Sequence, residues 1–226
     1  MTDAVPESLN ARFAALHAER FESWEAEKLA KNIAQRAALV AAFDPAAVVQ
    51  AGDTLPPFTL ADDEGRPLSL DDLVADGPAV LVFFRFAGCP ACNLALPYYD
   101  RQLRPALDAA GIRLVAISPH LPEQGLGEIR RRHALGYTVA SDRDNRLGRA
   151  LGITFSRGEV PEGQPTPGWI GALTGTGTAE FPQPAVILID RDRTVRFVAV
   201  SPDWLDRTEA PEILAAVAGL KVREAA

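Results

Sequence analysis

The spacing of hydrophobic positions changes near residue 50. Between residues 7 and 43, apolar residues recur at intervals close to 3.6: Leu9, Phe13, Leu16, Phe21, Trp24, Ile33 and Val40. This spacing is typical of an amphipathic helix, and Asp44-Pro45 ends it. We interpret the helix as an arm that packs on the following domain, with a dimerisation element as the alternative.

After residue 51 the chain alternates between short apolar runs and amphipathic segments. A small hairpin is predicted around the polar turn at residues 62–65. Further strands are predicted over five short runs: 79–84, 112–118, 137–140, 184–190 and 194–200. Helices are predicted between them and at the end of the chain, over 90–110, 123–135, 144–151 and 208–220.

This order of elements predicts an α/β fold with a central mixed β-sheet flanked by helices. The final hairpin adds antiparallel strands to parallel ones, so the sheet is mixed. Residues 1–50 are expected to form an N-terminal helical extension, and residues 51–226 one domain. Residues 153–183, rich in Gly, Pro and Thr, are expected to interrupt that domain as an irregular insertion of functional importance.

Composition narrows the class of protein. The 226 residues are 47% hydrophobic and 23% charged, which is enough apolar material for a buried core. A net charge of −7 argues against nucleic-acid or anionic-lipid partners. No apolar run reaches the ~18 residues of a membrane span, and the first residues do not resemble a secretion signal. We therefore expect a cytoplasmic protein without a membrane partner.

The two cysteines, Cys89 and Cys92, directly follow the 79–84 strand. Pro90 suits the first position of a helix, so Cys89 is expected at a helix N-terminus, where the helix dipole stabilises a thiolate. Cys92 lies on the same side of the first turn and can close a disulfide with oxidised Cys89. We predict an exposed attacking Cys89 and a buried resolving Cys92. Two structural core cysteines, or half of a zinc site, are the alternatives.

The three histidines are far apart in the sequence and give no metal-ligand spacing. No metal or cofactor is therefore expected.

Four segments carry a resemblance to a known family: GDTLPPFTLADDEGRPLSLDDL, FFRFAGCPAC, IRLVAISPHLPE and PQPAVILIDRDRTVRFVAVSPD. They are similar to the peroxiredoxin (AhpC/TSA) proteins of the thioredoxin-fold superfamily, over about residues 50–220. The resemblance implies a thioredoxin-like fold and a Cys89 that reduces peroxide. It also implies that Cys92 resolves the oxidised cysteine and that a thioredoxin-type reductant regenerates the pair.

Some positions depart from the pattern of that family. Typical peroxiredoxins carry Pro and then Thr or Ser at the positions that hold Val82 and Phe86 here. They also carry an Arg just before the late strand, where this chain has Pro184. By resemblance to thioredoxins, Pro184 is expected to be a cis-proline that faces the cysteines. An ordinary trans proline that begins a strand is the alternative.

Two side chains near the cysteines are candidate helpers. Arg85 precedes Cys89 by four residues at the C-terminal edge of its strand, where a guanidinium lowers the pKa of a thiol and orients a peroxide. A surface salt bridge to Asp53 or Glu64 is the alternative. His120 follows the next strand and could transfer protons, or be an exposed loop residue without a role.

The predicted elements also give expected positions for Asn93 and Trp169. Asn93 is expected on the surface of the helix that follows the cysteines. Trp169, in the irregular insertion, either covers the disulfide or lies in a solvated loop.

Three functions stay open. The first is a thiol-dependent peroxidase. The second is a protein thiol–disulfide oxidoreductase without peroxide chemistry. The third is a non-catalytic redox sensor or binding protein. The expected partners are a peroxide or disulfide substrate and a thioredoxin-like reductant, with a homodimer as a further candidate.

Overall fold

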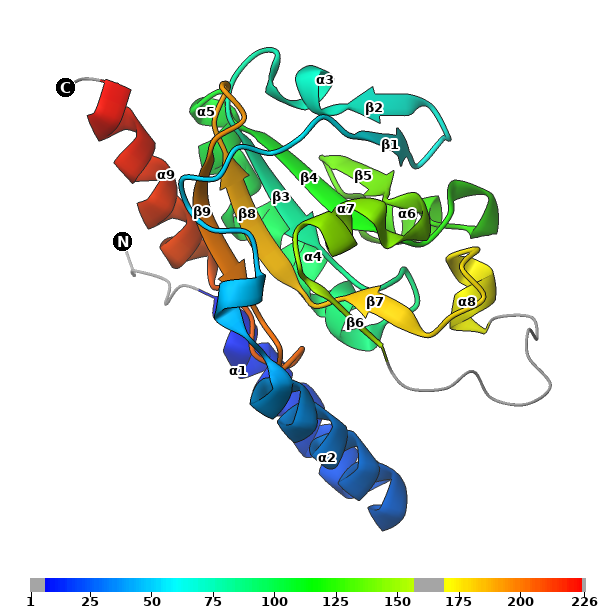
Figure 1. Cartoon of the computed structure of the whole chain (residues 1–226). Helices are drawn as coiled ribbons and strands as arrows, with labels where there is room; N and C mark the ends of the chain where they lie inside the picture. Colours follow the sequence, from blue (N-terminus) through cyan, green and yellow to red (C-terminus); the bar gives the residue numbers. More distant parts are fainter. Residues whose placement is uncertain (1–6, 157–168, 225–226) are drawn as a thin grey trace.

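A seven-stranded sheet in the order β2-β1-β5-β4-β3-β8-β9 forms the centre of the protein (Figure 1). The structure is a computed structural model that describes residues 7–156 and 169–224, the last four of these by their backbone alone. The strands of the sheet are β1 (Thr59–Asp62), β2 (Pro67–Ser69), β3 (Ala79–Phe83), β4 (Arg113–Ser118), β5 (Thr138–Ser141), β8 (Ala185–Ile189) and β9 (Val195–Val200).

The interior strand β3 makes the sheet mixed, because one of its neighbours is parallel and the other antiparallel. It pairs in parallel with β4, Leu81 opposite Val115, and antiparallel with β8, Leu81 opposite Ile187. β4 and β5 are also parallel, whereas β1 with β2 and β8 with β9 are antiparallel. The predicted mixed sheet and both predicted hairpins are confirmed.

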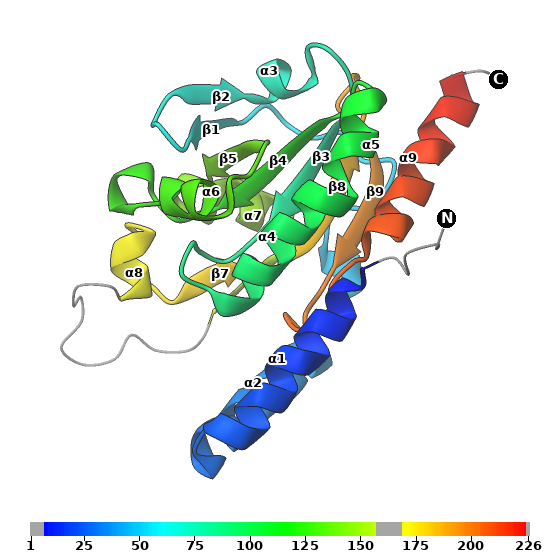
Figure 2. The same cartoon turned by 180° about the vertical axis from the view of Figure 1, so that it is seen from behind.

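Helices cover both faces of the sheet (Figures 1 and 2). Alternate residues of β3 point to opposite faces, so Val80 and Val82 join one apolar cluster while Leu81 and Phe83 join the other. The helices are α1 (Leu9–Ser23), α2 (Ala26–Ala42), α3 (Leu70–Val74), α4 (Pro90–Gln102), α5 (Arg104–Ala109), α6 (Gly127–His133), α7 (Arg146–Ala150), α8 (Ile170–Leu173) and α9 (Ala210–Glu224). Short 3₁₀ turns occupy Pro45–Ala47, Pro122–Gln124 and Arg143–Asn145. None of the helices in the described ranges is long and apolar enough to cross a membrane.

The prediction of one helix over residues 7–43 is wrong, because the chain folds back at Trp24 into the pair α1 and α2. Trp24 has extended dihedral angles (φ −95°, ψ 146°) and caps α1 through its N–H and the Arg20 carbonyl. Leu9 and Phe13 are buried in the main core, so the arm packs on its own chain as interpreted. The far end of the pair extends away from the sheet (Figures 1 and 2).

The helix predicted over residues 90–110 is likewise two helices, α4 and α5. Pro105 lies in the first turn of α5. The break lies at Leu103, which caps α4 through its N–H and the Tyr99 carbonyl, and Pro105 suits the first turn of a new helix.

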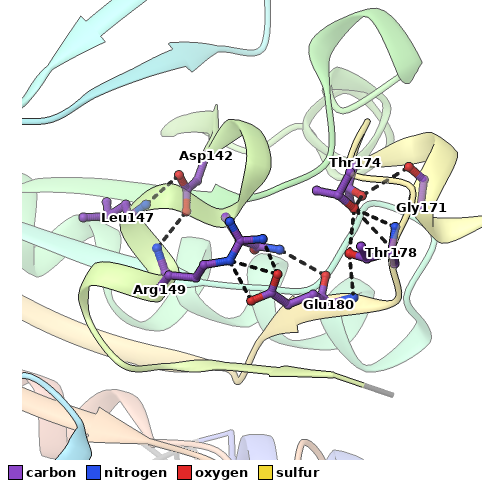
Figure 3. Close-up of polar contacts among 10 residues, drawn as sticks. Asp142, Leu147, Arg149, Gly171, Thr174, Thr178 and Glu180 are labelled. Atoms are coloured by element: carbon purple, nitrogen blue, oxygen red, sulfur yellow. Dashed lines mark hydrogen bonds and ion pairs between the residues drawn. The ribbon is translucent and has the colours of Figure 1, made fainter. Parts of the chain in front are cut away.

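The segment 153–183 is less irregular than expected. It contains α8 and a small two-stranded sheet of β6 (Thr154–Ser156) and β7 (Glu180–Pro182), while residues 157–168 lie outside the described residues. Figure 3 shows how β7 is tied to α7: Arg149 donates hydrogen bonds of 3.0 Å to the Glu180 carboxylate. Nearby, buried Asp142 accepts the backbone N–H groups of Leu147 and Gly148, at 2.9 and 2.8 Å.

Candidate active site

The two cysteines lie at the beginning of α4, directly after β3. Cys89 is the N-cap residue, with extended dihedral angles, and Pro90 is the first helical residue. Both thiols are free, and both residues are 0% exposed. The prediction of an exposed Cys89 is therefore wrong, because Cys89 and Trp204 belong to the same buried cluster as α1.

Arg85 contacts the first sulfur directly. Its Nη2 donates a hydrogen bond to Cys89 Sγ at 3.1 Å. Arg85 is only 7% exposed, and its guanidinium carbon lies 4.4 Å from the centre of the Trp204 ring, a cation–π arrangement. The alternative of a surface salt bridge from Arg85 to Asp53 or Glu64 is wrong. The Asp53 carboxylate accepts the Gln50 N–H, and Glu64 makes an ion pair with Arg66.

The two thiols have opposite ionisation tendencies. Burial alone would raise the pKa of Cys89, but a hydrogen bond from Cys92 and the charges of Arg85 and Arg207 lower this pKa well below its usual range. Burial and the neighbouring Cys89 raise the pKa of Cys92 well above its usual range. The pair can therefore hold a thiolate on Cys89 beside a neutral thiol on Cys92.

Arg207 is a site residue that the sequence analysis missed. It lies after β9, and its Nη2 is 3.6 Å from Cys92 Sγ. Its Nε donates to the Trp204 carbonyl at 3.2 Å, and its guanidinium lies 5.5 Å from the centre of the Phe13 ring on α1. The contact with Cys92 spans 115 positions along the chain, and no local pattern marks it.

His120 holds the loop between β3 and α4. Its Nδ1 accepts the Ala87 N–H at 3.2 Å, and its Nε2 lies 2.9 Å from the Gln124 carbonyl. This pairing places the single ring proton on Nε2, and burial lowers the pKa of His120. The alternative of an exposed histidine is wrong. Both ring nitrogens are engaged by backbone groups, which favours a structural role over proton transfer.

Asn93, a partly exposed residue of α4, holds the same loop from the other side. Its Nδ2 donates to the carbonyls of Ala87 and Cys89, at 2.8 and 2.9 Å. Its Oδ1 accepts from Arg132 and His133 of α6, at 2.9 and 2.7 Å. These bonds connect the cysteine loop to a second helix.

Pro184 stands beside the end of the cysteine strand. It precedes β8, whose first residue, Ala185, pairs with Phe83 of β3. Pro184 and Arg207 line the same narrow cavity, and Pro184 accepts the Ser201 N–H at 2.7 Å. The cis form of Pro184 and its position facing the cysteines stay predictions.

Trp169 caps the beginning of α8, and its ring lies against Gly171. Its role as a cover of the disulfide also stays a prediction.

Comparison with known proteins shows the family to which the chain belongs. The sequence profile of the AhpC/TSA family matches residues 51–198, which is more than half of the chain. The chain belongs to the AhpC/TSA family. The chain is also similar to Peroxiredoxin Bcp of Escherichia coli strain K12, with 32% identity over 111 residues, 46% of this chain and 65% of that protein.

A second relative of this AhpC/TSA protein is named as a thiol-disulfide oxidoreductase and not as a peroxiredoxin. Thiol-disulfide oxidoreductase ResA of Geobacillus thermodenitrificans is 29% identical over 113 residues, 49% of this chain and 62% of that protein. The match thus spans less than two thirds of the length of either relative. The crystal structure of peroxidoxin BcpB from Mycobacterium tuberculosis shares the fold, with a TM-score of 0.60 at 24% identity over 77% of this chain and 97% of that one.

Two of the three residues that depart from the typical peroxiredoxin pattern, Val82 and Phe86, have apolar roles here. Val82 is a buried residue of β3, and the Phe86 ring packs 5.8 Å from that of Phe181. The cationic groups on the sulfurs come instead from Arg85 and Arg207. Within residues 7–156 and 169–224, no three His, Cys, Asp or Glu side chains gather in a way that could hold a metal ion.

Proposed function

We propose that this AhpC/TSA protein reduces hydroperoxides through Cys89, with Cys92 as the resolving thiol. The observation that carries the proposal is the 3.1 Å hydrogen bond from Arg85 to Cys89 Sγ at the N-terminus of α4. A thiolate stabilised in this way is the nucleophilic form of cysteine. The same guanidinium can stabilise the negative charge that develops on the peroxide oxygens.

The proposed reaction takes two steps. The Cys89 thiolate attacks one peroxide oxygen, the O–O bond breaks, and the leaving oxygen takes up a proton to become an alcohol or water. Cys89 is then a sulfenic acid. The Cys92 sulfur attacks that sulfenic sulfur and loses its proton, water leaves, and a disulfide forms. In total two thiols lose two electrons and two protons, and the hydroperoxide takes up both.

Regeneration requires a second thiol pair. A thioredoxin-type dithiol would attack the disulfide, pass through a mixed disulfide, and leave the two cysteines reduced and itself oxidised. Because both cysteines are 0% exposed, the site must open for this exchange. A cytoplasmic location belongs to the same proposal.

A protein thiol–disulfide oxidoreductase is the second candidate. The CxxC pair at a helix N-terminus favours it, and the relative named thiol-disulfide oxidoreductase ResA is consistent with it. The burial of Cys89 favours the peroxidase, because a small hydroperoxide needs much less opening to reach the sulfur than a disulfide on a folded protein.

A parallel pair of turnover assays separates the candidates. With thioredoxin, thioredoxin reductase and NADPH, we expect NADPH oxidation to depend on added hydroperoxide and to stop in Cys89→Ser. With insulin as the disulfide substrate, we expect little activity. Hydroperoxide-independent insulin reduction, together with no peroxide turnover, would contradict the proposal and favour the second candidate.

A further inference from the structure

The resolving sulfur has a buried cation of its own. Arg207 Nη2 lies 3.6 Å from Cys92 Sγ, whereas Arg85 Nη2 bonds to Cys89 Sγ. Arg207 is 4% exposed, and Cys92 is 0% exposed, so solvent screens the charge on this guanidinium little. Each of the two sulfurs therefore lies beside a different guanidinium group.

No carboxylate pairs with Arg207 among the described residues. The contacts of its side chain are a sulfur, a backbone carbonyl and an aromatic ring. In contrast, Arg36, which lies near the same tryptophan, makes an ion pair with Asp203 at 2.9 Å. A buried charge without a counterion is costly, so the position of Arg207 favours a negative charge on the sulfur beside it.

The helix α1 lies beside the loop that follows β9 and carries Arg207 (Figures 1 and 2). Asn10 Nδ2 donates to the Arg207 carbonyl at 3.0 Å, and Asn10 Oδ1 accepts the Arg207 N–H at 2.9 Å. About one turn further along α1, the buried Phe13 places its ring centre 5.5 Å from the guanidinium. Near the end of the helix, Arg20 lies 5.3 Å from the centre of the Trp204 ring. The N-terminal extension thus contacts both the backbone and the side chain of Arg207.

The resolving step needs a negative charge on Cys92, because a thiolate and not a thiol attacks the oxidised sulfur. Burial raises the pKa of Cys92, and Cys89 raises it further, whereas Arg207 and Arg85 lower it. When Cys89 becomes a sulfenic acid it loses its negative charge, so the two guanidinium groups then oppose burial alone. Of the two, Arg207 is the one that contacts Cys92 Sγ.

We propose that Arg207, positioned by the N-terminal extension, stabilises the Cys92 thiolate that attacks oxidised Cys89. This inference rests on the proposed function and assigns a catalytic group to its second step. The Cys92 thiol releases its proton, the thiolate forms a bond to the sulfenic sulfur, and the S–O bond breaks. The leaving hydroxide takes up one proton and becomes water, so no further oxidant is needed. Asn10 and Phe13 act through Arg207 and are positioning residues.

A pH-jump experiment measures the attack by Cys92 without any peroxide. One equivalent of methyl methanethiosulfonate at acidic pH converts Cys89 to a methyl disulfide while Cys92 stays protonated. A jump to higher pH starts the attack, which forms the Cys89–Cys92 disulfide and releases methanethiol, and acid quenching with mass spectrometry follows the reaction. The rate should rise with pH until Cys92 is ionised. In Arg207→Met we expect this rise to move to higher pH and the rate below it to fall about tenfold, as loss of a contact with a charged group predicts.

Three variants accompany this measurement. Arg207→Lys keeps the charge and should recover most of the lost rate. Asn10→Ala keeps the guanidinium but removes both bonds to its backbone, so we expect a shift in the same direction and a loss of about threefold. Arg36→Met is the matched control, because Arg36 lies near the same Trp204 ring but pairs with Asp203. It should lower the free energy of unfolding and leave the pH profile as in wild type.

Single-turnover oxidation by hydrogen peroxide tests the role within the proposed reaction. In Arg207→Met we expect the Cys89 sulfenic acid, trapped as a dimedone adduct, to persist about tenfold longer than in wild type. Formation of the sulfenic acid should slow less than its conversion to the disulfide, because Arg85 still bonds to Cys89.

Each result bears on the proposal. A wild-type pH profile in Arg207→Met would overturn the role of Arg207, and so would an equal shift in Arg36→Met. A wild-type profile in Asn10→Ala would overturn the positioning by the extension. If Arg207→Met does not fold, Arg207→Lys and Asn10→Ala carry the test. If Arg207→Met slows loss of the methyl disulfide but hydrogen peroxide does not oxidise Cys89, the proposed function fails while the role of Arg207 in disulfide formation stands.

Discussion

Replacement of Arg85 by methionine tests the electrostatic basis of the site. Methionine keeps most of the length and apolar stem of the side chain but removes the donor that lies 3.1 Å from Cys89 Sγ. A hydrogen bond to a charged group contributes about 1.5–3 kcal/mol. Because Arg85 is 7% exposed, solvent screens this contact little.

That energy corresponds to a change of about 10- to 100-fold in an ionisation constant. Since the guanidinium favours the thiolate, its removal is expected to weaken the acid and raise the pKa of Cys89. The other thiol does not obscure the measurement, because the pKa of Cys92 is raised well above its usual range.

The assay is thiolate absorbance near 240 nm, followed against pH in the reduced protein. Arg85→Lys, which keeps the charge, should show a smaller change than Arg85→Met. Arg101→Met is a matched control, since Arg101 lies on the exposed side of α4 and pairs with Glu7. An ionisation constant within twofold of wild type in Arg85→Met would refute the reasoning.

Three further outcomes are expected. Cys92→Ser should still react with hydroperoxide but stop at the sulfenic acid, detectable as a dimedone adduct by mass spectrometry; a disulfide-free wild type after oxidation would contradict this role. Glu209→Gln should lower the free energy of unfolding in urea by about 1–3 kcal/mol, because this carboxylate accepts the first N–H groups of α1 at 3.0 and 2.9 Å; exposed Glu19→Gln is the control, and equal effects would refute the anchor. The lowered pKa of Cys89 contributes stability that is present above the unfolded thiol's pKa and lost as pH falls through the folded value. The Tm difference between the reduced wild type and Cys89→Ser should therefore shrink at acidic pH, and a difference that grows there would contradict the assignment of the thiolate.

The fold was largely predictable because its signals are local. Short apolar runs rich in Val, Ile and Leu, such as residues 79–84 and 112–118, are typical of strands that are buried on both faces, and both contain strands of the sheet. Helix interruptions were harder to predict. Trp24 fits the apolar period of a helix, yet it breaks the helix so that α2 can fold back beside α1 (Figure 2).

The site was predictable only in its local part. Cys89, Cys92 and Arg85 lie within one short segment, and their proximity follows from a strand that leads into a helix. Arg20 and Arg207 reach the site from opposite ends of the chain, and such packing leaves no periodic pattern in a single sequence. The burial of Cys89 follows from the same long-range packing, which explains why its predicted exposure was wrong.

Stopped-flow oxidation of the reduced protein by hydrogen peroxide, followed by tryptophan fluorescence, tests the central claim most directly. Trp204 lies 4.4 Å from the Arg85 guanidinium that bonds to Cys89, so loss of the thiolate should change its emission. The account predicts oxidation several orders of magnitude faster than that of a free thiol, absent in Cys89→Ser and retained in Cys92→Ser. Oxidation no faster than a free thiol would contradict the assignment as a peroxidase.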